Sequence, residues 1–180
     1  MHIKPKKLRE YPLYLRWIYR HLEKKSGQFL YPWYCWGRLP FLQVLFFLFW
    51  ARLDRKKSLL DPALRALVQV RVAQLNGCAF CVDYNGLNLL KRTNSMDKFD
   101  HLQEWRTHSL FADPEKLVLE YTEEIARPES KVSTELMDRL KKHFSDDQIV
   151  ELTALIAFQT MSAKFNAALD IPSQGMCKIP

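Results

Sequence analysis

The sequence predicts an all-α fold, a compact multi-helix domain with an extra helical segment at its N-terminus. Apolar residues recur at steps of three and four along most of the 180-residue chain, which is the spacing of amphipathic helices. Helix-start residues precede several of these stretches, and the five glycines are too few for the tight turns of an all-β protein. Hydrophobic residues make up 48% and charged residues 26%, which is typical of a globular protein with a buried core.

Residues 1–58 are predicted to form an aromatic and basic helical extension. Apolar and basic side chains alternate at helical spacing over 11–25, and a second helix over 40–54 contains the apolar run LPFLQVLFFLFW. This run is shorter than the about 20 residues that a membrane-spanning helix needs, so we expect a buried or interfacial helix. Because an exposed run of this kind favours aggregation, we expect the extension to pack on the core or on a neighbouring subunit. Contact with an anionic membrane surface is an alternative that we do not favour.

Residues 59–180 are predicted to form the main domain, which starts with a well-marked helix. Asp61 supplies an N-cap oxygen and Pro62 suits the first helical position. Apolar residues then recur at helical steps until Asn76-Gly77, a pair that commonly ends a helix. The next helix is expected to open at Cys78 and to run to about residue 92.

Four more helices are predicted in the rest of the main domain. They are expected over residues 95–106, 113–126, 133–144 and 149–169, with 127–130 as a loop. Ser145 and Gln148 have the spacing of a capping box, which marks the start of the last helix. Since that helix is apolar on most faces, we predict that it is the central buried helix.

The charge and the cysteine content limit the partners and the location of the protein. The formal net charge is +7, but no recognised nucleic-acid module accompanies it, so we expect no nucleic-acid partner. No secretory signal is evident at the N-terminus, and four cysteines are too few for a disulfide-stapled scaffold of this size, so a cytoplasmic location is expected. The five histidines show no metal-ligand spacing, and we expect neither a metal nor a cofactor.

The stretch NGCAFCVDYNG places Cys78 and Cys81 three residues apart at a predicted helix start. Residues at this spacing share a helix face, and the N–H groups at a helix N-terminus favour a thiolate, the reactive form of a cysteine. One sulfur can then attack a substrate while the other resolves the product as a disulfide. Two alternatives stay open: half of a zinc site, for which the sequence offers no second pair of ligands, and two small buried core residues.

The segment ALVQVRVAQLNGCAFCVDYNGLNLLK resembles the signature of the carboxymuconolactone decarboxylase-like superfamily, in its alkyl hydroperoxidase D-like branch. Downstream blocks agree as well, among them Leu119–Glu123, His143–Asp146 and Phe165–Leu169, so the resemblance covers about residues 60–172. It implies an all-helical protein that assembles as trimers or hexamers. It also implies reduction of peroxides or disulfides by the two cysteines, which a dithiol donor such as a lipoyl protein or a thioredoxin-like protein reduces again.

The chain departs from this family at the two positions of its proton relay. The family has a glutamate twelve residues before the first cysteine and a histidine four residues after the second, and Ala66 and Asn85 occupy these positions here. Alanine carries no proton, and asparagine cannot act as a general base near pH 7, although Asn85 can still hydrogen-bond a thiol. Other groups could take this role, and they are Asp83, Tyr84, His101, Glu120 and Glu124. Arg71 and Gln74 on the preceding helix are further candidates for the pocket.

The expected function is that of a thiol-dependent antioxidant oxidoreductase with Cys78, Cys81 and Asn85 as its site residues. Which cysteine attacks stays open, although the family's histidine position, one turn beyond Cys81, favours that sulfur. One alternative is a non-catalytic, redox-responsive oligomer that has lost the proton relay. A lactone decarboxylase is less favoured, because that branch of the family does not depend on a cysteine pair.

Overall fold

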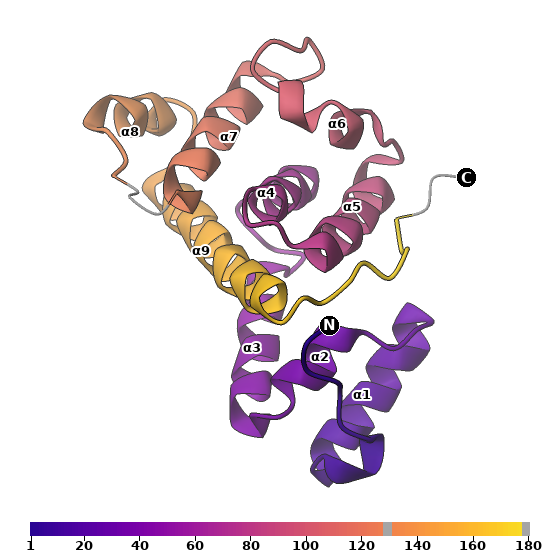
Figure 1. Cartoon of the computed structure of the whole chain (residues 1–180). Helices are drawn as coiled ribbons and strands as arrows, with labels where there is room; N and C mark the ends of the chain where they lie inside the picture. The colour runs from indigo at the N-terminus through magenta and orange to yellow at the C-terminus, as the bar shows by residue number, and fades with distance from the viewer. Residues whose placement is uncertain (128–130, 178–180) are drawn as a thin grey trace.

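The computed structural model describes residues 1–127 and 131–177, and every regular element within these ranges is helical (Figure 1). The predicted all-α fold is therefore confirmed. In chain order the elements are the 3-10 helix η1 (Leu8–Glu10), α1 (Leu13–Ser26), α2 (Tyr31–Trp36), α3 (Pro40–Leu53), α4 (Pro62–Leu75), α5 (Ala79–Thr93), α6 (Asp97–Asp100), the 3-10 helix η2 (Leu102–Glu104), α7 (Asp113–Ala126), α8 (Thr134–Lys141) and α9 (Asp146–Ala168).

Helix α4 lies at the centre of the main domain, with α5, α7 and α9 packed around it (Figure 1). It begins as predicted, because the Oδ1 atom of Asp61 accepts hydrogen bonds from the amides of Ala63 and Leu64 at 2.8 and 3.0 Å. Our expectation that α9 is the central helix was wrong, since α9 leaves Val150 and Met161 exposed on one side. Both helices are apolar on most faces, and apolar character alone does not tell which of them has neighbours on every side.

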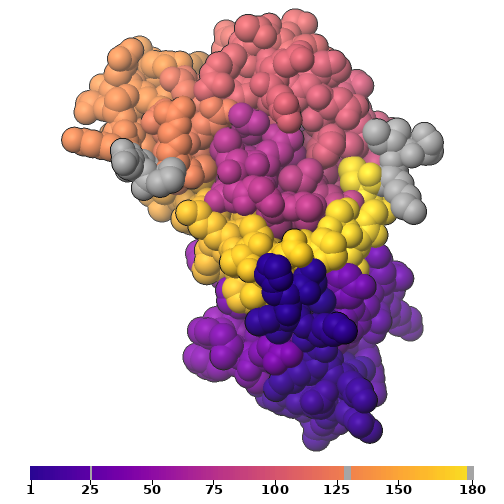
Figure 2. Space-filling model, in the orientation of Figure 1, coloured from indigo at the N-terminus to yellow at the C-terminus, as the bar shows by residue number. Residues whose placement is uncertain are grey.

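The N-terminal helices form a lobe beneath the main domain (Figure 2). Its centre is a small cluster of Tyr11, Leu15, Tyr19 and Tyr34, separate from the main core. Helix α3 joins this lobe to the main domain, because it packs on α9 and its Leu53 belongs to the main core. The extension therefore packs on the core of its own chain.

Three predicted elements differ from the structure. The expected helix over 95–106 is two short pieces, α6 and η2, because Phe99, Leu102 and Trp105 follow one another at steps of three, which suits a 3-10 turn better than an α-helix. The segment between the two predicted N-terminal helices contains a further short helix, α2, and α8 ends at Lys141 instead of residue 144. Of the predicted loop 127–130, residues 128–130 lie outside the described residues.

The segment after α9 runs back along α5 and crosses the junction between the two lobes (Figures 1 and 2). The side chain of Gln174 bridges the segment to the N-terminal lobe, since its Nε2 donates to the carbonyl of Phe29 at 2.6 Å and its Oε1 accepts from the amide of Tyr31 at 3.1 Å. The segment thus fixes the position of α5 relative to the N-terminal lobe. In the described part of the chain, none of the helices combines the length and apolar character needed to cross a membrane.

Candidate active site around Cys78 and Cys81

The two cysteines lie at the N-terminus of α5, directly after α4 ends. Gly77 forms the turn with φ of 63°, a left-handed conformation that favours glycine. Cys78 is the N-cap residue, and its Sγ accepts a hydrogen bond from the amide of Cys81 at 3.1 Å. The two sulfurs form a disulfide, with an S–S distance of 2.06 Å. Both sulfurs thus lie within one turn at the start of α5.

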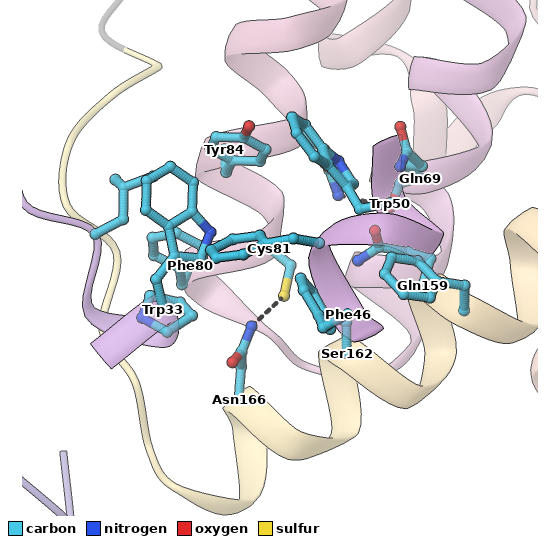
Figure 3. A pocket seen from close by; sticks show the side chains of 15 residues that line it. Trp33, Phe46, Trp50, Gln69, Phe80, Cys81, Tyr84, Gln159, Ser162 and Asn166 are labelled. Atoms are coloured by element: carbon cyan, nitrogen blue, oxygen red, sulfur yellow. Dashed lines mark hydrogen bonds between the residues drawn. The ribbon is translucent and has the colours of Figure 1, made fainter. Parts of the chain in front are cut away.

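Cys81 faces a small cavity between the N-terminal lobe and the main domain (Figure 3). The cavity has a volume of about 50 Å³. Aromatic side chains from both lobes supply most of its wall, and they are Trp33, Phe46, Phe47, Trp50, Phe80, Tyr84 and Phe158. The extension thus contributes directly to the surroundings of Cys81.

The polar groups of this cavity are amides and a hydroxyl, and one of the amides contacts the sulfur. The Nδ2 of Asn166 donates to the Sγ of Cys81 at 3.3 Å, as Figure 3 shows. The Oδ1 of Asn166 is buried and has no hydrogen-bond partner among the described residues. The other polar side chains that line the cavity are Gln69, Asn85, Gln159 and Ser162. A bound molecule would therefore find both donors and acceptors, but no charge.

Asn85 lies in the same cavity, but it does not make the contact to Cys81 that we considered. Its Nδ2 donates to the backbone carbonyl of Gln69 at 3.3 Å, on the neighbouring helix α4. Asn166 makes that contact instead, from α9. Ala66 is fully buried in an apolar cluster with Leu67 and Val70, so its position holds no polar group.

The candidate proton carriers are distributed unevenly around the pair. Tyr84 lines the Cys81 cavity, and burial raises the pKa of its hydroxyl, so it stays a donor near neutral pH. Glu120 pairs with Arg139 on the surface, and Glu124 pairs with Arg127. Among the described residues, neither glutamate lines the cavity or contacts a cysteine, and neither does the half-buried His101.

Cys78, whose exposed fraction is only 1%, lines a second and open groove of about 470 Å³ that the C-terminal segment also borders. Asp83 lies in this groove and accepts three hydrogen bonds from the segment, from the Ser173 hydroxyl at 2.8 Å and from the Gln174 and Cys177 amides at 2.9 and 2.6 Å. Burial by itself raises the pKa of Asp83, but these hydrogen bonds outweigh it and hold the pKa below its usual value. Asp83 therefore anchors the segment as a carboxylate.

Arg71 and Gln74 have different surroundings. The guanidinium of Arg71 binds the buried Glu123, with its Nε 2.9 Å from Oε1, and Trp105 donates to the same oxygen at 2.8 Å. Arg71 thus takes part in a structural ion pair between α4 and α7. Gln74 lines the groove beside Cys78.

Sequence reasoning missed Asn166 as a contact of the redox pair, although a signal was present. Gln159, Ser162 and Asn166 follow one another at steps of three and four on a helix that is otherwise mostly apolar, which marks one polar face. The tryptophans differ in their surroundings: Trp105 packs in an apolar cluster, whereas Trp33 and Trp50 line the cavity.

No group of three or more His, Cys, Asp or Glu side chains within residues 1–127 and 131–177 is arranged to hold a metal ion. Two further cysteines are free thiols there. Cys35 is buried in the N-terminal lobe, and Cys177 lies on the C-terminal segment at the edge of the Cys78 groove.

Known proteins are similar to this chain in sequence. A model of the carboxymuconolactone decarboxylase family matches residues 41–124. The protein YnjA of Escherichia coli is 44% identical over 176 residues, which are 96% of this chain and 95% of that protein.

Solved structures share the fold over nearly the whole chain. A peroxidase-related protein from Ralstonia eutropha, described as an alkylhydroperoxidase AhpD core, matches with a TM-score of 0.87 at 17% identity, over 98% of this chain and 94% of that one. The debrominase Bmp8 matches with a TM-score of 0.83 at 20% identity, over 97% and 92%. A cysteine-to-alanine variant of Bmp8 in complex with 2,3,4-tribromopyrrole matches with a TM-score of 0.81 at 19% identity, over 94% and 90%. The N-terminal helices thus have counterparts in these structures. The chain belongs to the carboxymuconolactone decarboxylase family and has the fold of its alkyl hydroperoxidase D-like members.

Proposed function

We propose that this protein is a thiol-dependent antioxidant oxidoreductase that reduces peroxides through Cys78 and Cys81. The observation that carries the proposal is the different environment of the two sulfurs. Cys81 borders a small cavity with neutral polar groups, whereas Cys78 borders a second and open groove. In this proposal Cys81 meets a small oxidant in its cavity, and Cys78, which lines the groove although it is only 1% exposed, exchanges with a larger reducing partner.

In this proposal the thiolate of Cys81 attacks one oxygen of the peroxide. An S–O bond forms, the O–O bond breaks, and the leaving oxygen takes a proton from solvent or from the hydroxyl of Tyr84. Cys78 then attacks the sulfur of the resulting sulfenic acid, and water leaves as the disulfide forms. A dithiol donor returns two electrons and two protons by exchange at Cys78, which gives back both thiols.

Two hydrogen bonds support the reactivity of the reduced pair. An N–H group that donates to a thiolate favours the charged form and lowers the pKa of the thiol. Cys78 has such a donor in the amide of Cys81, and Cys81 has one in Asn166. The site thus favours thiolates through neutral donors, which compensates in part for the absent family glutamate and histidine.

Competing functions fit the site less well. Bmp8 is a debrominase, but a cavity of about 50 Å³ is smaller than the about 150 Å³ cavity that holds a benzene ring, so a halogenated ring is not favoured. A lactone decarboxylase has no need for the disulfide-forming pair. A redox-responsive oligomer without turnover would use the pair, and the first experiment distinguishes it from an enzyme.

The test compares the reduced protein with the Cys78→Ser and Cys81→Ser variants. We expect one equivalent of hydrogen peroxide to remove two thiols from the wild type, and excess dithiothreitol to sustain peroxide consumption over many turnovers. In the Cys78→Ser variant, a sulfenic acid on Cys81 should be trapped by dimedone and located by peptide mass spectrometry. Thiols that survive excess peroxide in the wild type would contradict the proposal, and oxidation without turnover would favour the redox-responsive oligomer.

A further inference from the structure

We infer that the cavity beside Cys81 selects its oxidant by size, with Phe47 and Trp50 of the N-terminal extension as the outer wall. Hydrogen peroxide is the substrate class that fits, and hydroperoxides with an aryl group are excluded. The inference rests on the proposed peroxide reduction. It also gives the N-terminal helices a role in the chemistry of the pair.

The volume of the cavity is the first argument. A water molecule needs about 10–15 Å³ of such space, so about 50 Å³ accommodates only a few water-sized groups. Hydrogen peroxide is slightly larger than water and fits this space. A phenyl ring does not, because the cavity has about a third of the volume that binds benzene in an engineered protein core.

The second argument is that the wall is thin but tightly packed. Phe47 and Trp50 line the cavity on one side and an apolar hollow on the outer surface of α1 and α3 on the other. Phe47 packs edge-on against Trp33, with ring centroids 5.9 Å apart, and the neighbouring Phe46 packs against Phe158 at 4.9 Å. Rings held in this way yield to a larger ligand only at a cost in packing energy.

The third argument is the hydrogen-bonding capacity of the inner wall. The Oδ1 of Asn166 is an unpartnered acceptor in a residue that is only 1% exposed, and its Nδ2 already points to Cys81. A buried acceptor without a partner favours a ligand that donates an O–H group beside the sulfur. Ser162 and Gln159 line the cavity one and two turns before Asn166 on the same helix, so further polar groups are available for the second O–H group of hydrogen peroxide. An organic hydroperoxide offers an O–H group at one end only.

The first arm of the test measures kcat/KM of the full-length protein with hydrogen peroxide and with cumene hydroperoxide, at a fixed dithiol concentration. We expect the wild type to prefer hydrogen peroxide by at least about tenfold, and Phe47→Ala or Trp50→Ala to reduce this preference by about tenfold. Phe144→Ala is the matched control. It removes another half-buried ring that packs on the main core but does not line the cavity, so it should leave the preference unchanged.

The second arm does not depend on turnover. In the Cys78→Ser variant, methyl and benzyl methanethiolsulfonate should modify Cys81 at very different rates, and Trp50→Ala in the same background should bring the two rates together. Peptide mass spectrometry separates this reaction from those of Cys35 and Cys177.

Equal rates for the methyl and benzyl reagents in the Cys78→Ser variant would overturn the size selection, and so would equal kcat/KM for both peroxides in the wild type. If the protein consumes no peroxide, the proposed function fails, and the reagent rates still decide whether the cavity selects by size.

Discussion

Asn166 is the side chain whose role depends most on a single contact. It is the one amide of the cavity that donates to a sulfur among the hydrogen bonds of the described residues, and it does so from the last turns of α9. We expect this contact to persist in the reduced protein, where a donated N–H group stabilises a thiolate. Its effect should therefore be visible in the ionisation of Cys81, and not only in the stability of the fold.

We expect Asn166→Leu to raise the pKa of the Cys81 thiol and to slow its reaction with hydrogen peroxide near neutral pH by about ten- to a hundredfold, the loss of one charge-assisted hydrogen bond. The pH dependence of iodoacetamide alkylation in the Cys78→Ser background measures this pKa directly. Thr160→Val is the control on the same helix, because the Thr160 hydroxyl is buried, has no hydrogen-bond partner among the described residues and does not line the cavity. An unchanged alkylation profile in Asn166→Leu would leave Asn166 with a packing role only.

At the scale of residues, the sequence predicts the redox pair but not its surroundings. Cys78 and Cys81 are recognisable because the chemistry needs two sulfurs one helical turn apart. Their partners come from α9 and from the N-terminal lobe, more than thirty residues away in either direction. Spacing along the chain therefore carries no information about them, and Asn85, the residue at the right spacing, hydrogen-bonds a backbone carbonyl instead.

Segments from both ends of the chain contact helix α5. The contact with the C-terminal segment is the easier one to test. Asp83 alone accepts the hydrogen bonds of Ser173, Gln174 and Cys177. The pKa of Asp83 is held below its usual value. The stabilisation that the ionised Asp83 gives is therefore complete above about pH 4, which is the pKa of an aspartate in an unfolded chain. It is lost as the pH falls through the lower pKa of the folded state.

We expect Asp83→Asn to release this segment while the helices stay folded. Hydrogen exchange of the Gln174 and Cys177 amides should become about ten- to a hundredfold faster at pH 7, since the charged acceptor is lost. Asp138→Asn, at an exposed carboxylate on α8, should leave these amides unchanged. In the wild type the same amides should lose protection below about pH 4. Slow exchange in Asp83→Asn would show that the bridge from Gln174 to the N-terminal lobe suffices to hold the segment.

Local signals predict helix starts well and helix neighbours poorly. Asp61, Ser133 and Ser145 cap their helices as expected, because an N-cap acts on amides only two or three residues ahead. The break between α6 and η2 and the central place of α4 depend on what packs against these segments. Such contacts join residues far apart in the chain, and a single sequence does not record them.

On the whole molecule, charge and apolar surface are concentrated in the same lobe. Residues 1–58 contain thirteen Lys and Arg but three Asp and Glu. Eight of the fifteen exposed large hydrophobic residues of the described chain lie on α1 and α3, among them Trp17 and Leu48. An apolar surface of this extent on one lobe is typical of an interface. We propose that a second copy of the chain covers it, as in the trimers or hexamers that the family resemblance implies.

We expect the protein to sediment at a multiple of 21.3 kDa, and Trp17→Glu or Leu48→Glu to lower that mass, because a buried carboxylate without a partner opposes association. Leu110→Glu is the control, since Leu110 is an exposed apolar residue of the main domain, in the segment before α7. The basic lobes repel one another, so the assembly should tighten as salt screens them. Binding of the basic lobe to an anionic membrane surface would instead weaken as salt is added. A monomer that floats with anionic vesicles at low salt and is released at high salt would assign the apolar surface to lipid and exclude the oligomer.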